Sequence, residues 1–156
     1  MEERYLTHSA VETKALAKKI AEELAPGITV CLQGDLGTGK TTFAQGLLEA
    51  LGATGPFTSP TFVIMKEYPL RRAVNGIKRI YHVDAYRVGE KDLRQLGFTD
   101  WCQDKEGIVI LEWPERIEGL LPKNMWRMHF VWKSDTEREI TIHRPWQTDT
   151  GSGRES

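Results

Sequence analysis

Apolar residues recur along the chain either three or four positions apart, as in helices, or at alternate positions and in short runs, as in strands, and these patterns predict a succession of helices and strands. Residues 8–27 carry apolar side chains three or four positions apart, which predicts an amphipathic helix. Ser9 is placed to cap its N-terminus, with Glu12 three residues later as in a capping box, and Pro26 followed by Gly27 ends it. The apolar face expected of this helix consists of Val11, Leu16, Ile20 and Leu24.

Two runs, residues 28–33 and 107–113, are almost wholly apolar, which predicts short strands buried on both faces. A second helix is expected over residues 40–52, directly after the glycine-rich stretch 34–39. Shorter helical segments are expected at residues 90–98, 99–104 and 114–122.

Two hairpins are also expected. The first begins as a strand near Phe62, turns at Asn75-Gly76 and returns over residues 79–87. The second pairs residues 126–132, where apolar residues occupy alternate positions, with residues 137–143. One face of its first strand should carry Trp126, Met128, Phe130 and Trp132.

These elements predict an α/β fold in three layers, with a mixed sheet and attached β-hairpins. The length of 156 residues suits one domain, which we place at residues 1–143, and no internal repeat indicates a second. Residues 144–156 are polar and rich in glycine and serine, a composition typical of a disordered tail.

Composition narrows the classes of function. The net charge of −1 argues against a surface that holds nucleic acid by itself, which is usually basic. Cys31 and Cys102 form no metal-binding motif and are expected to be reduced thiols. No apolar run approaches the roughly 20 residues of a membrane span, and the charged N-terminus does not resemble a signal peptide. A cytoplasmic location without membrane contact is expected.

The stretch GDLGTGKTT at residues 34–42 matches the pattern G-x-x-x-x-G-K-[ST]. Its glycines allow successive backbone N–H groups to surround a phosphate, and the helix that follows adds its positive N-terminal end. The Lys40 side chain reaches the terminal phosphates and the Thr41 hydroxyl binds Mg²⁺. The motif predicts a P-loop NTPase-like arrangement, with phosphate-binding residues Asp35, Leu36, Gly37, Thr38, Gly39, Lys40, Thr41 and Thr42.

A P-loop protein needs an acid at the end of a buried strand as a second anchor for the metal. Glu112 follows the more apolar strand and resembles the usual metal-binding acid. Asp84 ends a less apolar strand and could bind the metal through water or orient the attacking water. We predict Lys40, Asp84 and Glu112 as catalytic residues and Thr41, Glu112 and Asp84 as metal ligands. His82 could support Asp84, or it could be a core histidine.

The segment TSPTF at residues 58–62 offers hydroxyl groups in the place where P-loop switch proteins sense the terminal phosphate. A plain Ser/Thr turn before a strand is the alternative interpretation. Trp113 directly follows Glu112, so a role in the site competes with ordinary core packing.

Adenine is favoured as the base by elimination. The chain has no N-K-x-D motif, which a GTPase of the Ras type would carry. A D-x-x-G sequence does occur at Asp104–Gly107, but it precedes the apolar strand rather than following it. The expected cofactors are therefore ATP and Mg²⁺.

Four segments in this order and at these separations, GDLGTGKTT, TSPTF, HVDAYR and LEWPE, resemble the bacterial TsaE (YjeE) ATPase family. The resemblance covers about residues 5–143. It implies a small ATPase that takes part in making threonylcarbamoyladenosine beside the anticodon of tRNA. It also implies that the chain binds the paired TsaB and TsaD subunits, resets them through its ATP cycle, and meets tRNA only through that complex.

The resemblance also carries residue roles. Lys40, Thr41 and Thr42 match the family's phosphate and magnesium residues, Thr61 its switch-like loop, and Asp84 and Glu112 its acids, with Trp113 after the second. Thr13 near the start of the first helix, and Glu137 and Arg138 in the last hairpin, would reach the base or ribose. Thr38 stands where alanine is common, which should be tolerated because the loop acts through its backbone.

A small P-loop nucleotide or sugar kinase is one alternative, and a nucleotide-binding scaffold with negligible turnover is another. A kinase needs a second pocket and usually an arginine-bearing lid. Arg71 and Arg72 lie together in the first expected hairpin, but no helical insertion that could form a lid is visible.

Overall fold

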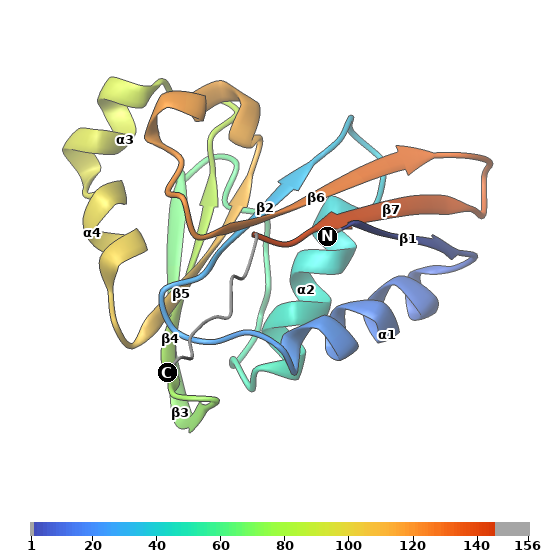
Figure 1. Ribbon diagram of the computed structural model, residues 1–156, viewed down its shortest axis with the longest axis horizontal. Coiled ribbons are helices and arrows are strands. Elements are labelled where there is room, and N and C mark those ends of the chain that lie inside the picture. Colours follow the sequence, from blue (N-terminus) through green and yellow to red (C-terminus); the bar gives the residue numbers. More distant parts are fainter. Residues whose placement is uncertain (1, 146–156) are drawn as a thin grey trace, which may run out of the picture.

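The computed structural model describes residues 2–145, and within them a mixed seven-stranded sheet carries helices on both faces (Figure 1). In chain order the elements are β1 (Glu2–Thr7), α1 (Ala10–Ala21), β2 (Thr29–Gln33), α2 (Lys40–Ala50), β3 (Met65–Val74), β4 (Ile77–Asp84), α3 (Glu90–Leu96), α4 (Phe98–Gln103), β5 (Gly107–Glu112), the 3₁₀ segment η1 (Pro114–Leu120), β6 (Met125–Trp132) and β7 (Arg138–His143).

The sheet has the strand order β1-β7-β6-β2-β5-β4-β3. β2 pairs in parallel with β5 and β6, and β4 pairs in parallel with β5. The β3–β4 and β6–β7 pairs are antiparallel hairpins, and β1 adds antiparallel to β7. The predicted α/β class, the mixed sheet and both hairpins are therefore confirmed.

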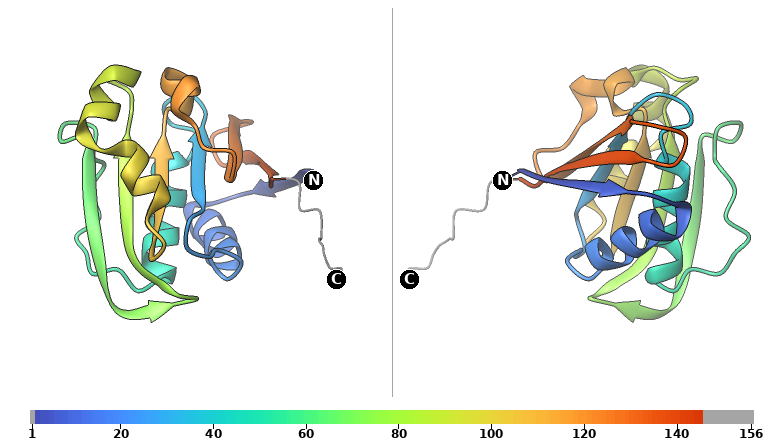
Figure 2. Two further views of the ribbon diagram at one scale, coloured as in Figure 1. Left: turned by 60° about the vertical axis from the view of Figure 1, so that its left-hand side comes forward. Right: turned by 90° about the vertical axis from the view of Figure 1, so that its right-hand side faces the viewer.

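The two faces of the sheet are covered by different helices, which gives three layers (Figure 2). Residues Ile80, Ile108 and Ile110 point to the side of α1 and α2. Their neighbours along the same strands, such as Val83 and Val109, join a second cluster with Leu93 of α3 and Phe98 of α4. Because both faces are covered, the central strands are apolar at almost every position.

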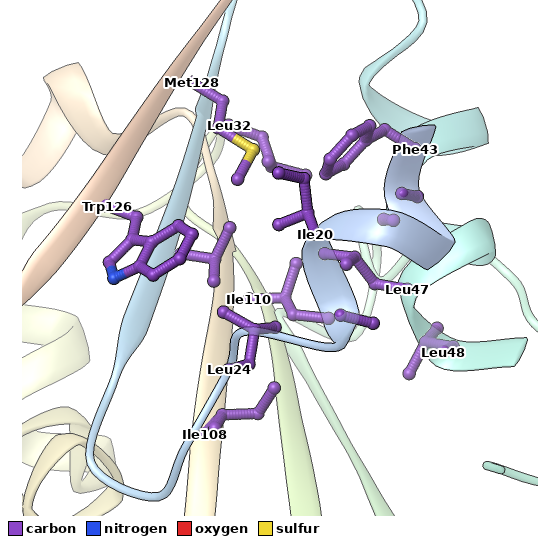
Figure 3. Close-up of a cluster of buried hydrophobic side chains, with 14 of the residues drawn as sticks. Ile20, Leu24, Leu32, Phe43, Leu47, Leu48, Ile108, Ile110, Trp126 and Met128 are labelled. Carbon is purple, nitrogen blue, oxygen red and sulfur yellow. The ribbon is translucent and has the colours of Figure 1, made fainter. Parts of the chain in front are cut away.

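The larger core lies between the sheet and the pair α1–α2 (Figure 3). Ile20 belongs to α1, Leu24 comes three residues after that helix ends, and Phe43 and Leu47 belong to α2. α1 and α2 approach closely at Gly46, where an added Cβ atom would lie 2.8 Å from the Cβ of Ala17. These contacts fix α2, and with it the glycine-rich loop at its N-terminus, against the sheet.

Several expectations about the elements were wrong in detail. Val11 is 77% exposed, so it does not belong to the apolar face of α1. The first hairpin begins at Met65 rather than near Phe62, because residues 61–63 form a turn. Trp132 is exposed although its strand neighbours Met128 and Phe130 are buried.

The strand β1 was not predicted. From Glu2 to Leu6 its residues alternate between exposed and partly exposed positions, because it lies at the edge of the sheet, and only Thr7 is buried; its charged side chains hide the pattern. The proposed division into a domain at 1–143 and a tail at 144–156 stays a prediction, since residues 146–156 lie outside the described part. No helix within residues 2–145 is long and apolar enough to cross a membrane.

Candidate functional site

The glycine-rich loop joins the end of β2 to the start of α2. At Gly34 an added Cβ atom would lie 2.6 Å from the carbonyl oxygen of Phe130, so no side chain fits there. Gly39 caps α2 with a φ of 102°, a left-handed conformation that favours glycine, and no side chain caps the helix. The N–H groups at the start of α2 are therefore free of side-chain caps, which suits the binding of an anion.

An open cleft of about 580 Å³ lies over this loop. The loop and the first turn of α2 contribute six of the predicted site residues: Leu36, Gly37, Gly39, Lys40, Thr41 and Thr42. The carboxyl ends of the neighbouring strands and the segments beside them contribute Thr61, Asp84, Glu112 and Trp113. Thr13 from α1 and Arg138 from β7 line the opposite side. The structure thus brings together most of the residues that the sequence singled out.

Three predicted residues do not line the cleft. Asp35 and Thr38 take part in the loop's own turn, where the Thr38 hydroxyl donates a hydrogen bond to the Asp35 carbonyl oxygen at 2.6 Å. Glu137 lies beside the cleft, where its side chain faces Ser134 and His8. Its hydrogen bonds with Ser134 belong to the turn that precedes Arg138.

Lys40 is the most unusual residue of the site. It is only 5% exposed, and within residues 2–145 its ammonium makes no hydrogen bond. The ammonium lies 3.6 Å from the centroid of the Trp113 ring, a cation–π contact. Burial lowers the pKa of Lys40, while the nearby carboxylates, first of all Glu112, act in the opposite direction. A buried ammonium without acceptors is well suited to an anionic ligand.

The two predicted acids lie side by side. Asp84 and Glu112 are opposite each other in the parallel pair β4–β5, and they are 2% and 3% exposed. Asp84 accepts hydrogen bonds from the Thr61 hydroxyl at 2.9 Å and from the backbone N–H of Tyr86 at 2.8 Å. Glu112 pairs instead with Nε2 of His82, at 2.8 Å. Asp84, which was one of the two possibilities for His82, is therefore held by other groups.

The TSPTF segment contacts the site through its hydroxyl groups. The hydroxyl groups of Ser59 and Thr61 are hydrogen-bonded at 2.7 Å, and the Thr61 hydroxyl donates a further hydrogen bond to the carboxylate of Asp84. The next two residues, Phe62 and Val63, are 82% and 64% exposed. The segment therefore joins a carboxylate of the cleft to an exposed apolar surface, which a plain turn would not require.

Residues around the far rim of the cleft were missed by sequence reasoning. His8, Asp135 and Thr136 line it, the first from the end of β1 and the others from the β6–β7 turn. Arg138 is fixed there by donating to the carbonyl oxygens of Gly37 and Ser134, at 3.2 and 2.8 Å. Only the order of the strands brings these segments to the cleft, and no motif marks them.

The oxygen atoms that line the cleft would suit a magnesium ion that arrived together with a nucleotide. In the part of the chain that the structure describes, no cluster of three or more His, Cys, Asp or Glu residues could hold a metal by itself. Mg²⁺ commonly takes one or two protein oxygens and completes its shell with phosphates and water. Thr41 and Glu112 in a cleft that also holds the buried Lys40 ammonium match that pattern.

A buried parallel strand, a glycine loop and a helix, with acids at the ends of adjacent strands, define a P-loop NTPase-like fold. The sequence model of the family described as "Threonylcarbamoyl adenosine biosynthesis protein TsaE" matches residues 7–140. The chain belongs to this family.

Relatives and a solved structure agree with this assignment. The chain is 40% identical to the tRNA threonylcarbamoyladenosine biosynthesis protein TsaE of Bacillus subtilis, over 89% of this chain and 84% of that protein. It is 33% identical to the protein of the same name from Treponema pallidum, over 89% and 98%. The crystal structure of Bacillus subtilis YdiB superposes with a TM-score of 0.70 at 36% identity, covering 91% of this chain and 84% of that one.

Proposed function

We propose that this chain is a Mg²⁺-dependent ATPase that binds the TsaB–TsaD pair and supports threonylcarbamoyladenosine modification of tRNA through its ATP cycle. The observation that carries the ATPase part is Lys40, whose buried ammonium lacks a hydrogen bond within residues 2–145 and faces a cleft lined by Thr41, Asp84 and Glu112. Its relatives' names supply the link to tRNA modification.

Each residue has a distinct task in this proposal. Lys40 and the N–H groups at the start of α2 bind the phosphates. Thr41 and Glu112 would hold Mg²⁺, which would supply positive charge to offset the charge that develops on the terminal phosphoryl group. Asp84, kept in place by Thr61 and Tyr86, orients the attacking water.

The kinase alternative receives no specific support. Arg71 and Arg72 are exposed on β3 and do not line the cleft. Phosphate release from ATP should proceed without any phosphoryl acceptor and should require Mg²⁺. ATP consumption only in the presence of an added nucleoside or sugar would instead favour the kinase.

Partner binding is tested separately from hydrolysis. Fluorescently labelled protein is titrated with purified TsaB–TsaD in the presence of a non-hydrolysable ATP analogue and of ADP, and tighter binding is expected with the analogue. Direct binding to tRNA should be weak and should disappear as salt rises, because the net charge of −1 leaves only non-specific phosphate contacts. Tight, salt-resistant binding of bare tRNA would contradict the role through a partner. A cytoplasmic location is part of the proposal.

A further inference from the structure

His82 is a buried polar residue that the proposed reaction does not use directly. Its side chain is 2% exposed, and its Nε2 atom lies 2.8 Å from Oε2 of Glu112, whose side chain is 4% exposed. An imidazole and a carboxylate both lose the solvation of water at such a depth, and the hydrogen bond between them replaces part of it, while Nδ1 of His82 has no partner within residues 2–145.

The sheet fixes the geometry of this pair. His82 lies opposite Ile110 on β5 and opposite Lys66 on β3, so strands on both sides hold its backbone. Glu112 follows Ile110 by two residues and points to the same face of the sheet, which brings it within reach of the imidazole. β4 therefore presents two polar side chains to the site, Asp84 beside the cleft and His82 one step deeper in the core.

The two carboxylates are held differently. Both oxygens of Asp84 accept hydrogen bonds, from Thr61 and Tyr86. The side chain of Glu112 is hydrogen-bonded through Oε2 to His82, and among the described residues Oε1 makes no hydrogen bond. Of the two acids, Glu112 thus keeps an oxygen available for a ligand.

We propose that His82 is a positioning residue that holds Oε2 of Glu112 so that Oε1 faces the cation bound with the nucleotide. The inference rests on the proposed function. An ionised carboxylate only accepts hydrogen bonds, so Nε2 of His82 must be the donor. Partners of this kind orient metal-binding carboxylates, and their loss typically weakens metal binding by about 10- to 100-fold.

Three variants separate positioning from packing. His82→Leu removes the donor and keeps an apolar side chain in the core. His82→Gln restores an N–H donor on a side chain of similar reach. Ile80→Val is the matched control, because Ile80 is buried on the same face of β4 but belongs to the apolar core. Thermal unfolding and circular dichroism establish that each variant is folded.

The first measurement is the affinity for Mn²⁺, used as a spectroscopic probe in place of Mg²⁺, in the presence of saturating ADP. His82→Leu should weaken Mn²⁺ binding by about tenfold or more, His82→Gln should recover most of it, and Ile80→Val should leave it unchanged. The Mg²⁺ concentration for half-maximal ATP hydrolysis should shift in the same order, while the affinity for ADP without metal stays constant.

The second measurement is nitrogen-15 NMR of the histidine rings, with the signal of His82 assigned from its loss in the variants. It should report the proton on Nε2, and Glu112→Gln should perturb that signal. The inference is overturned if the proton is on Nδ1, if His82→Leu leaves Mn²⁺ affinity unchanged, or if Leu and Gln weaken it equally. If the Mn²⁺ affinities of the wild type and the three variants follow the expected order but the wild type does not hydrolyse ATP, the ATPase proposal is overturned and the inference about His82 stands.

Discussion

The ammonium of Lys40 rests 3.6 Å from the centre of the Trp113 ring, enclosed by protein and without a hydrogen bond to any residue of the described segment 2–145. Burial lowers the pKa of Lys40, which means that the charged form is less stable here than in the unfolded chain. The residue is therefore placed at a cost to stability, as expected of a group whose acceptor is a ligand.

Lys40→Met should separate function from stability. ATP hydrolysis should fall by at least about 100-fold, because each charge-assisted hydrogen bond to a phosphate is worth about 1.5–3 kcal/mol. The thermal unfolding midpoint should stay unchanged or rise, since methionine keeps the apolar stem and removes the buried charge. Phosphate release and a melting curve on the same preparation check both. A folded variant that still hydrolyses ATP would contradict the assignment of the glycine loop.

Binding of nucleotide should alter the fluorescence of Trp113. Phosphates that attract the Lys40 ammonium would remove it from the indole ring, and the ring also contacts Tyr86, at a centroid distance of 4.9 Å. Titration with ADP should therefore change tryptophan emission, although the chain has four other tryptophans. Trp113→Phe should abolish most of the change. An equal change in that variant would mean that the signal arises elsewhere.

Glu112→Ala and Asp84→Ala should fail in different ways. Glu112 has an oxygen available for a cation, so its replacement should make hydrolysis depend on a much higher Mg²⁺ concentration. The oxygens of Asp84 already accept hydrogen bonds from Thr61 and Tyr86, so its replacement should lower turnover while nucleotide binding is largely kept. A Mg²⁺ titration of both variants distinguishes the two roles. Identical Mg²⁺ dependence would refute this division, but not the location of the site.

The opposite end of β4 and β5 carries an ion pair that predicts acid sensitivity. Asp104 accepts from the guanidinium of Arg79, at 3.0 Å from Nη2, and from the hydroxyl of Tyr81 at 2.7 Å. These donors, Arg79 first, hold the pKa of Asp104 well below its ordinary value of 3.8, and burial followed by the Asp104 contact raises the pKa of Tyr81 to about 12. A carboxyl with a lowered pKa stabilises the fold above its unfolded pKa, and that contribution is lost as pH falls through the folded value.

Asp104→Asn should therefore lower the free energy of unfolding by about 2 kcal/mol near neutral pH. The difference from wild type should shrink as pH falls below about 4, where the wild-type carboxyl in the unfolded chain is protonated. Urea unfolding between neutral and acidic pH measures this. Asp100→Asn, at an exposed position of α4, is the matched control and should have little effect. A difference that does not vary with pH would rule out the ion pair as its source.

The parts of the site that the sequence predicted are those that local rules govern. The glycine loop needs backbone freedom at Gly34 and Gly39, and a buried strand before it and a helix after it follow from apolar patterning. The acids at 84 and 112 could be found because each ends such a strand. The sheet then places them opposite each other, which the sequence implied only through their similar positions.

The parts of the site that the sequence did not predict depend on pairing between segments that are far apart in the chain. β1 pairs with β7, and that edge brings His8 to the rim of the cleft, although nothing near His8 signals it. The partner of His82 could not be identified from the sequence for the same reason. The sequence left open whether His82 supports Asp84, two residues away on the same strand, or is a core histidine, and its partner is in fact Glu112 on the neighbouring strand.

Thr61→Ala tests whether the TSPTF segment communicates between nucleotide and partner. The Thr61 hydroxyl donates to Asp84 inside the cleft, while the next residue, Phe62, is 82% exposed with its ring 4.8 Å from the guanidinium carbon of Arg87. A ligand that attracts this hydroxyl would also move the exposed side chain of Phe62, and a partner that contacts this apolar surface would bind differently.

The variant should therefore bind ATP nearly as well as wild type, yet lose most of the difference between ATP analogue and ADP in its affinity for TsaB–TsaD. Thr61→Ser, which keeps the hydroxyl, is the matched control and should retain that difference. Nucleotide affinity is measured on the isolated protein and partner affinity by titration with TsaB–TsaD in each nucleotide. If Thr61→Ala weakens ATP binding as much as it weakens partner binding, the hydroxyl serves the nucleotide alone and the segment is no switch. If wild type itself binds the pair equally in both nucleotides, there is no nucleotide-dependent signal for Thr61 to transmit.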